Sequence, residues 1–160
     1  MLSTNEKIVF IFIAILILIF ACWTIIEVCR PHEPAFIITA EEREMLARLT
    51  DLEAGICSPR CKRAVVSVVF NMRTTGYWGD TLEEVIYYPK AFSPAYLIEY
   101  YSNPSQEAYD AVDYVCQYGV TVPKVVRYFR ASRPHNWPEY ETWRVIDNIY
   151  FGYFTSDEYH

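Results

Sequence analysis

The segment from Leu46 to Arg73 constrains the fold more than any other part of the sequence. Apolar residues recur at helical spacing up to Gly55, and a second, more apolar run follows Ser58 and Pro59. Because glycine often ends a helix and proline is favoured in a first turn, we expect two helices joined by a tight connection. Glu53 falls on the last turn of the first predicted helix. It is the only acidic residue from there to Arg73, which makes it the first candidate for a functional residue.

Capping signals mark where these two helices begin. Thr39 followed by Glu42 is a capping box, so the first helix is predicted to start after Thr39. The second is predicted to run from Pro59 to Arg73, although its many valines would also suit a strand by periodicity alone. The proline at its start and its length favour a buried helix.

The later segments predict smaller elements that form the scaffold and walls of a cleft around Glu53. A short helix is expected after Thr81, a helical turn over 94–101, and a helix over 104–118 capped by Ser102 or Asn103. Residues 125–131 and 143–154 are rich in aromatic side chains and predict two strands. Helices followed by a small antiparallel sheet give an α+β fold.

A long apolar stretch precedes this domain. Residues from Ile8 to Ile26 carry no charge and nearly reach the ~20 residues that a membrane-spanning helix needs. The stretch is apolar on every face, so we expect one N-terminal transmembrane helix, with the rest of the chain outside the cell membrane. Two alternatives stay open, namely a lipoprotein modified at Cys22 and a secreted chain from which this segment is cleaved. Residues 1–28 are then the anchor or signal segment, 29–38 a spacer, and 39–160 the folded domain.

Charge and cysteine content exclude some functions. The net charge is −6, and an acidic domain is poorly suited to bind polyanions, so no nucleic-acid partner is expected. Outside the apolar stretch and its flank, the cysteines are Cys57, Cys61 and Cys116. They do not form a C-x-x-C pair and do not have the spacing of a zinc site, so the sequence predicts neither a metal nor a cofactor.

Four groups of residues follow one another in an order that is typical of one family. They are Glu53–Gly55 with Ala64–Val65 and Val68–Asn71, then Thr81–Ile86 with Ala91–Ser93, then Tyr128–Arg130, and finally Trp137. This order resembles the SleB/CwlJ-type cell wall hydrolases, which are the spore cortex-lytic enzymes and their relatives in bacteria and phage. The resemblance covers about residues 42–154.

The resemblance implies a lysozyme-like, lytic transglycosylase-like helical domain with a small sheet. It implies that residues 39–160 are a cell wall hydrolase catalytic domain, which cleaves peptidoglycan glycan strands between N-acetylmuramic acid and N-acetylglucosamine. It also implies Glu53 as the catalytic residue. The residues expected to bind the glycan are Asn71, Phe92, Ser93, Tyr128 and Trp137, and Asn71 is also expected to orient the loop after the first helix.

The sequence departs from the family pattern at several positions. Cys57 stands where the pattern has a second glutamate, and Cys61 where it has a glycine. Met72 replaces an arginine, and the histidine expected before the last phenylalanine is missing. Cys57 and Cys61 can form a disulfide that closes the loop between the two helices, and two free thiols are the alternative.

One carboxylate is sufficient for the implied reaction. A Glu53 flanked by apolar neighbours can be desolvated, which raises its pKa and retains its proton near neutral pH. It can protonate the glycosidic oxygen and then remove the proton of the sugar's own 6-hydroxyl, which closes a 1,6-anhydro ring. A hydrolase needs a second carboxylate roughly 5–10 Å away. The nearest candidates in the sequence are Asp51, Asp80, Glu83 and Glu84, and none has the signature of a second catalytic carboxylate.

Three functions therefore stay open. A membrane-anchored lytic transglycosylase is favoured. A true muramidase-type hydrolase would differ from it only in the product. A non-catalytic, membrane-anchored cell-wall-binding protein is suggested by the lost glutamate and the missing histidine.

Overall fold

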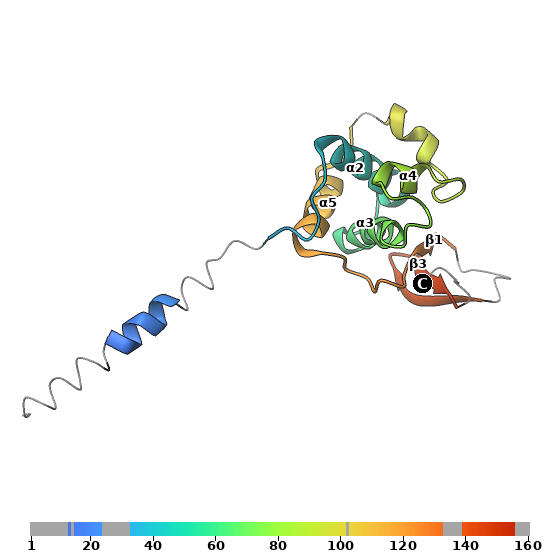
Figure 1. Cartoon of the computed structure of the whole chain (residues 1–160). Helices are drawn as coiled ribbons and strands as arrows, with labels where there is room; N and C mark the ends of the chain where they lie inside the picture. Colours follow the sequence, from blue (N-terminus) through green and yellow to red (C-terminus); the bar gives the residue numbers. More distant parts are fainter. Residues whose placement is uncertain (1–12, 14, 24–32, 102, 133–138, 156–160) are drawn as a thin grey trace, which may run out of the picture. The chain divides into compact units, whose positions relative to one another are not determined.

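The computed structural model describes residues 13, 15–23, 33–101, 103–132 and 139–155 (Figure 1). The chain divides into two units, Met1–Glu33 and Pro34–His160. In the first unit, residues 13 and 15–23 are helical, and the rest of the predicted membrane span over 8–26 lies outside the described residues. A search of the described residues finds no helix that is long and apolar enough to cross a membrane.

The described part of the second unit consists of helices followed by a small sheet. In chain order its elements are α2 (Ala40–Ala54), α3 (Pro59–Arg73), α4 (Leu82–Tyr87), the 3-10 helix η1 (Ala95–Tyr100), α5 (Gln106–Tyr118), β1 (Tyr128–Arg130), β2 (Tyr140–Ile146) and β3 (Ile149–Phe154). This mostly helical architecture with a small antiparallel sheet is the predicted one.

The predicted caps form at three helices. The Thr39 hydroxyl accepts the Glu42 N–H while the Glu42 carboxylate accepts the Thr39 N–H, and α4 has an equivalent box at Thr81. The Ser58 hydroxyl caps α3 by accepting the Cys61 N–H. Each cap satisfies N–H groups that have no partner within the helix, which fixes where the helix begins.

The predicted start of α5 is wrong by two residues. Ser105 caps this helix instead of Ser102 or Asn103, and its hydroxyl accepts the Ala108 N–H. The Asp51 carboxylate accepts hydrogen bonds from both the N–H and the hydroxyl of Ser105. This long-range contact holds Ser105 in the extended backbone that a cap requires.

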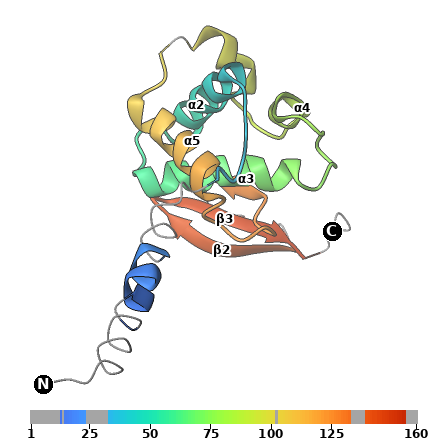
Figure 2. The same cartoon turned by 60° about the vertical axis from the view of Figure 1, so that its left-hand side comes forward.

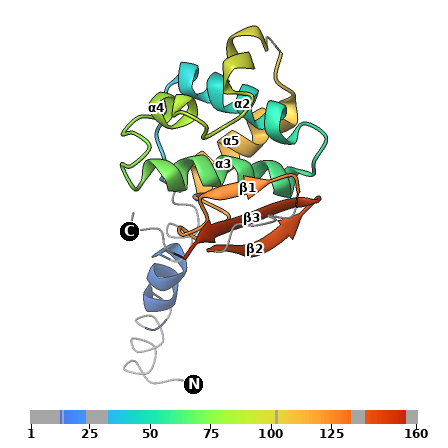
Figure 3. The ribbon, with the colours of Figure 1, turned by 90° about the vertical axis from the view of Figure 1, so that its right-hand side faces the viewer.

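Helix α3 lies at the centre of the second unit. Helices α2 and α5 pack on one side of it, and the sheet lies on the other side, in contact through β1 (Figures 2 and 3). Most residues from Cys61 to Met72 are therefore buried, including the valines that made a strand plausible. A helix covered on several sides lacks the usual amphipathic pattern, which explains the ambiguity in the sequence.

The sheet has three antiparallel strands in the order β1-β3-β2. The prediction of one strand over 143–154 is wrong, because Asp147 and Asn148 form a turn between β2 and β3. Their φ angles are 49° and 65°, a conformation that aspartate and asparagine tolerate and that two-residue hairpin turns require. The turn brings the Asp147 carboxylate to the start of α3, where it accepts the Ser58 N–H at 2.6 Å.

The end of the predicted spacer belongs to the second unit. The Phe36 ring stacks on the Phe70 ring of α3 with the centroids 4.2 Å apart. The Phe36 N–H donates to the Cys116 carbonyl at the end of α5. The ordered packing of this unit thus begins before the cap of α2.

Candidate active site

Glu53 lines a cleft of about 420 Å³. The remaining walls come from Val68 and Met72 of α3, from residues 88–93 after α4, and from residues 127–132 around β1. Trp78 and Ile149 complete the lining. Segments that lie far apart in the sequence therefore meet around the one carboxylate that the sequence singled out.

The surroundings of Glu53 favour its protonated form. It is the next-to-last residue of α2, and its side chain is half-buried. Burial raises the pKa of Glu53 to about 7, because the charged carboxylate loses hydration. Within the described part of the chain, Glu53 forms no hydrogen bond or ion pair that would offset this effect. A carboxyl group that titrates near neutral pH can donate a proton to a leaving group.

No second carboxylate joins Glu53 among the described residues that line the cleft. Asp51 points instead to Ser105 and Lys62. The Glu84 side chain accepts the N–H groups of Asp80 and Thr81 at the start of α4. Neither Asp80 nor Glu83 lines the cleft. The described lining of the cleft therefore contains one acid, whereas a two-carboxylate glycosidase places a second one beside its substrate.

Comparison with known proteins decides the family. The family model described as Cell Wall Hydrolase matches residues 58–152. The chain belongs to the cell wall hydrolase family. The resemblance noted in the sequence is thereby confirmed at the level of the family, while Glu53 itself precedes the matched range.

Two solved structures share the fold of this cell wall hydrolase. The catalytic domain of the germination-specific lytic transglycosylase SleB from Bacillus anthracis is 19% identical, with a TM-score of 0.64 over 72% of this chain and 96% of that one. The catalytic domain of the Bacillus cereus SleB protein is also 19% identical, with a TM-score of 0.64 over 77% and 97%. A search of curated proteins found no match.

The structure brings three of the residues expected to bind glycan into the cleft. Phe92, Ser93 and Tyr128 line it together with Glu53. The Phe92 ring packs near Phe129 of β1, with the centroids 6.0 Å apart, so the two walls support each other. Trp137 lies outside the described residues. The binding role of these residues stays a prediction.

Asn71 lies away from the cleft. Its side chain is 1% exposed, and its amide nitrogen donates to the carbonyls of Pro123 and Val126 at 2.9 Å each. These bonds hold the segment that leads into β1, and β1 carries one wall of the cleft. The expectation that Asn71 contacts the glycan does not agree with this placement, and Asn71 is better described as a positioning residue.

Three basic residues of the cleft were not singled out from the sequence as site residues. They are Lys90, Arg127 and Arg130. The signal available was a pair of arginines inside an otherwise apolar and aromatic strand sequence. Burial alone accounts for the pKa of Glu53, so these cations do not hold its carboxylate in the charged form. The cleft of this acidic protein thus combines basic side chains with a carboxyl group that is about half protonated at neutral pH.

Cys57 and Cys61 are free thiols in the structure. The disulfide considered from the sequence is not formed, and the alternative of two thiols is the one observed. Burial and the neighbouring Cys57 and Asp147 raise the pKa of the Cys61 thiol to about 12. Such a thiol is protonated at neutral pH, so Cys61 is not a reactive nucleophile.

Proposed function

We propose that this cell wall hydrolase is a lytic transglycosylase that cleaves peptidoglycan between N-acetylmuramic acid and N-acetylglucosamine. The observation that carries the proposal is the half-buried Glu53, the only acid among the described cleft residues, with a pKa raised to about 7. The solved domain from Bacillus anthracis, which shares the fold, is named a lytic transglycosylase. Aromatic side chains such as Tyr128 and Phe92 suit stacking on sugar rings.

In the proposed mechanism one group acts twice. Protonated Glu53 donates its proton to the glycosidic oxygen as the bond from that oxygen to C1 of the muramic acid breaks. The resulting carboxylate then accepts the proton of the 6-hydroxyl as its oxygen bonds to C1. The ring closes, no water is consumed, and Glu53 ends the cycle protonated.

The basic residues of the cleft suit such a substrate. The stem peptides of peptidoglycan carry free carboxylates, so Lys90, Arg127 and Arg130 can attract it to the cleft. The same residues lie on the walls formed after α4 and around β1. A substrate that spans the cleft would therefore meet both walls and Glu53.

Product analysis tests the type of reaction. Purified sacculi digested with the full chain are expected to release muropeptides with 1,6-anhydro ends, which borohydride does not reduce. A digest by a hydrolytic muramidase serves as the reference, because its products carry reducing ends and differ by one water in mass. Reducing ends would show that the enzyme is a hydrolase. Binding to sacculi without soluble products would support the non-catalytic alternative.

The pH dependence follows from the state of Glu53. Because the protonated form is the active one, kcat/KM is expected to fall as the pH rises through about 7, tending to tenfold for each further unit. The rate of dye release from labelled sacculi at constant ionic strength measures this dependence. A rate that stays constant or rises through this range would show that Glu53 does not act as the acid.

We also propose that residues 8–26 anchor the enzyme in the cell membrane with its catalytic domain outside. The support is the uncharged length of this stretch and the peptidoglycan substrate proposed above. Membrane fractions washed with alkaline carbonate should retain the chain. Release by this wash would favour a peripheral or secreted form.

A further inference from the structure

Three side chains with metal-binding atoms meet at the start of α3. Cys57 lies in the connection from α2, Cys61 in the first turn of α3, and Asp147 in the turn between β2 and β3. One sulfur from each cysteine and a carboxylate oxygen of Asp147 all lie within 4.8 Å of one another. None of these residues lines the cleft of Glu53, so the cluster is separate from the proposed active site.

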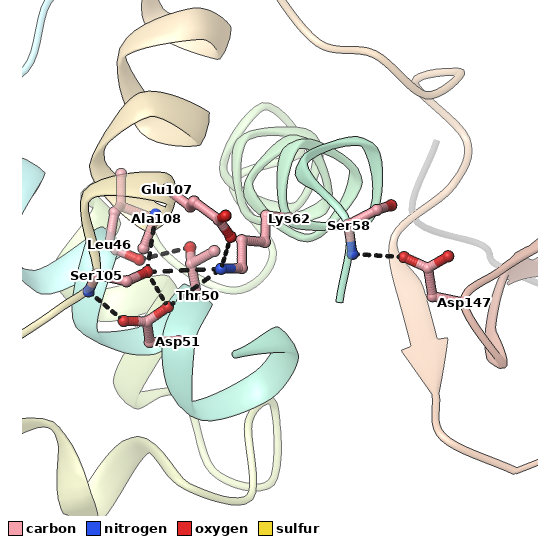
Figure 4. Close-up of polar contacts among 9 residues, drawn as sticks. All are labelled: Leu46, Thr50, Asp51, Ser58, Lys62, Ser105, Glu107, Ala108 and Asp147. Carbon is pink, nitrogen blue, oxygen red and sulfur yellow. Dashed lines mark hydrogen bonds and ion pairs between the residues drawn. The ribbon is translucent and has the colours of Figure 1, made fainter. Parts of the chain in front are cut away.

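Backbone groups contact two members of the cluster in the metal-free protein. The Asp147 carboxylate accepts the Ser58 N–H at 2.6 Å, as Figure 4 shows. The Cys61 thiol donates to the carbonyl of Ile146, with sulfur and oxygen 3.7 Å apart, and this contact is given up when a metal displaces the thiol proton. The Ser58 N–H bond to Asp147 does not involve a displaced proton, and such a supporting hydrogen bond can orient a carboxylate ligand of a metal site.

We propose that Cys57, Cys61 and Asp147 bind a Zn²⁺ ion, with water as the fourth ligand. Two sulfurs and one carboxylate match the donors that zinc prefers, whereas calcium and magnesium prefer oxygen alone. A tetrahedral ion with Zn–S bonds of about 2.3 Å places its two sulfur atoms about 3.8 Å apart. Because the observed separations are at most 4.8 Å, the two sulfur atoms need to approach by no more than about 1 Å, which side-chain rotation can supply.

One side of the three-residue cluster is open to solvent. Cys61 is buried, Cys57 is half-buried and Asp147 is exposed, so a solvent ion can reach the cluster and keep a water ligand. Binding displaces the two thiol protons, and the Zn²⁺ ion offsets two of the three negative charges of the donors. The sequence spacing did not predict this site, because the third ligand comes from a distant hairpin. A bound ion would tie the connection after Glu53 to the sheet.

Metal titration of the reduced, metal-free full chain tests the proposal. We expect one Zn²⁺ per chain in competition with a chromophoric chelator, and a thiolate-to-metal charge-transfer band when Co²⁺ replaces zinc. Cys57→Ser, Cys61→Ser and Asp147→Asn should each weaken zinc binding at least about tenfold, since even the loss of an outer-shell partner costs 10- to 100-fold. Asp147→Asn retains an oxygen for the Ser58 N–H, which guards against misfolding.

Cys116→Ser is the matched control, because Cys116 is a free thiol that is not part of the cluster. Its zinc affinity should equal that of the unmodified chain. Zinc binding that survives the three cluster variants would overturn the proposal, as would the absence of a charge-transfer band. None of these readouts requires glycan cleavage, so they are independent of the proposed function.

Discussion

Replacing Glu53 by glutamine is expected to lower the rate of sacculus cleavage at least about 100-fold, since a positioned general acid contributes that much or more. Glutamine has the size of glutamate but has no carboxyl proton to donate. Because burial raises the pKa of Glu53, a neutral side chain suits this position, and the variant should fold at least as stably. Muropeptide release from purified sacculi measures the loss, and thermal unfolding checks the fold.

Glu83→Gln is the matched control for this experiment. Glu83 lies on α4 and is exposed, and it does not line the cleft, so its replacement should leave the rate unchanged. Sacculus binding by the Glu53→Gln variant should persist, because the aromatic and basic walls are intact. A Glu53→Gln variant that cleaves sacculi at the normal rate would show that the proton comes from another group. A loss of cleavage in both variants would point to a general effect of charge.

Local signals in the sequence predicted the helices that carry Glu53. The capping box at Thr39 and the serine before Pro59 act within one helical turn, so their effect can be read without knowing the fold. The valine-rich sequence of α3 suited both a helix and a strand only because the helix is buried on several sides. The element that presents the candidate catalytic residue was therefore predictable from neighbouring residues alone.

Contacts between distant segments were not predictable in this way. Asn71 was expected in the cleft because of its place in a motif, but its partners Pro123 and Val126 lie on a segment that only the fold brings near. The same holds for the turn at Asp147 and its bond to Ser58. Such pairings depend on how the sheet packs on α3. The hydrophobic periodicity of the two paired segments does not predict them.

A buried ion pair involves Asp51, which lies in the same last turn of α2 as Glu53. Lys62 of α3 is fully buried, and its ammonium nitrogen lies 3.7 Å from an oxygen of Asp51 and 2.8 Å from an oxygen of Glu107 (Figure 4). The Asp51 side chain is 3% exposed, whereas that of Glu107 is 61% exposed. Asp51 is also bonded to Ser105, so this network joins α2, α3 and the start of α5.

Lys62→Met is expected to lower the free energy of unfolding by about 3–5 kcal/mol, because it leaves the Asp51 carboxylate buried without its cation. Glu107→Gln is the matched control on the same ammonium, and should cost under about 1 kcal/mol because water already solvates that carboxylate. Adding Asp51→Asn to Lys62→Met removes the stranded charge and should restore part of the loss. Urea unfolding of the four proteins measures these differences. Equal losses of stability for Lys62→Met and Glu107→Gln would contradict this prediction, because they would show that the buried Asp51 carboxylate does not depend on Lys62 more than the exposed Glu107 does. In that case the addition of Asp51→Asn would restore none of the lost stability.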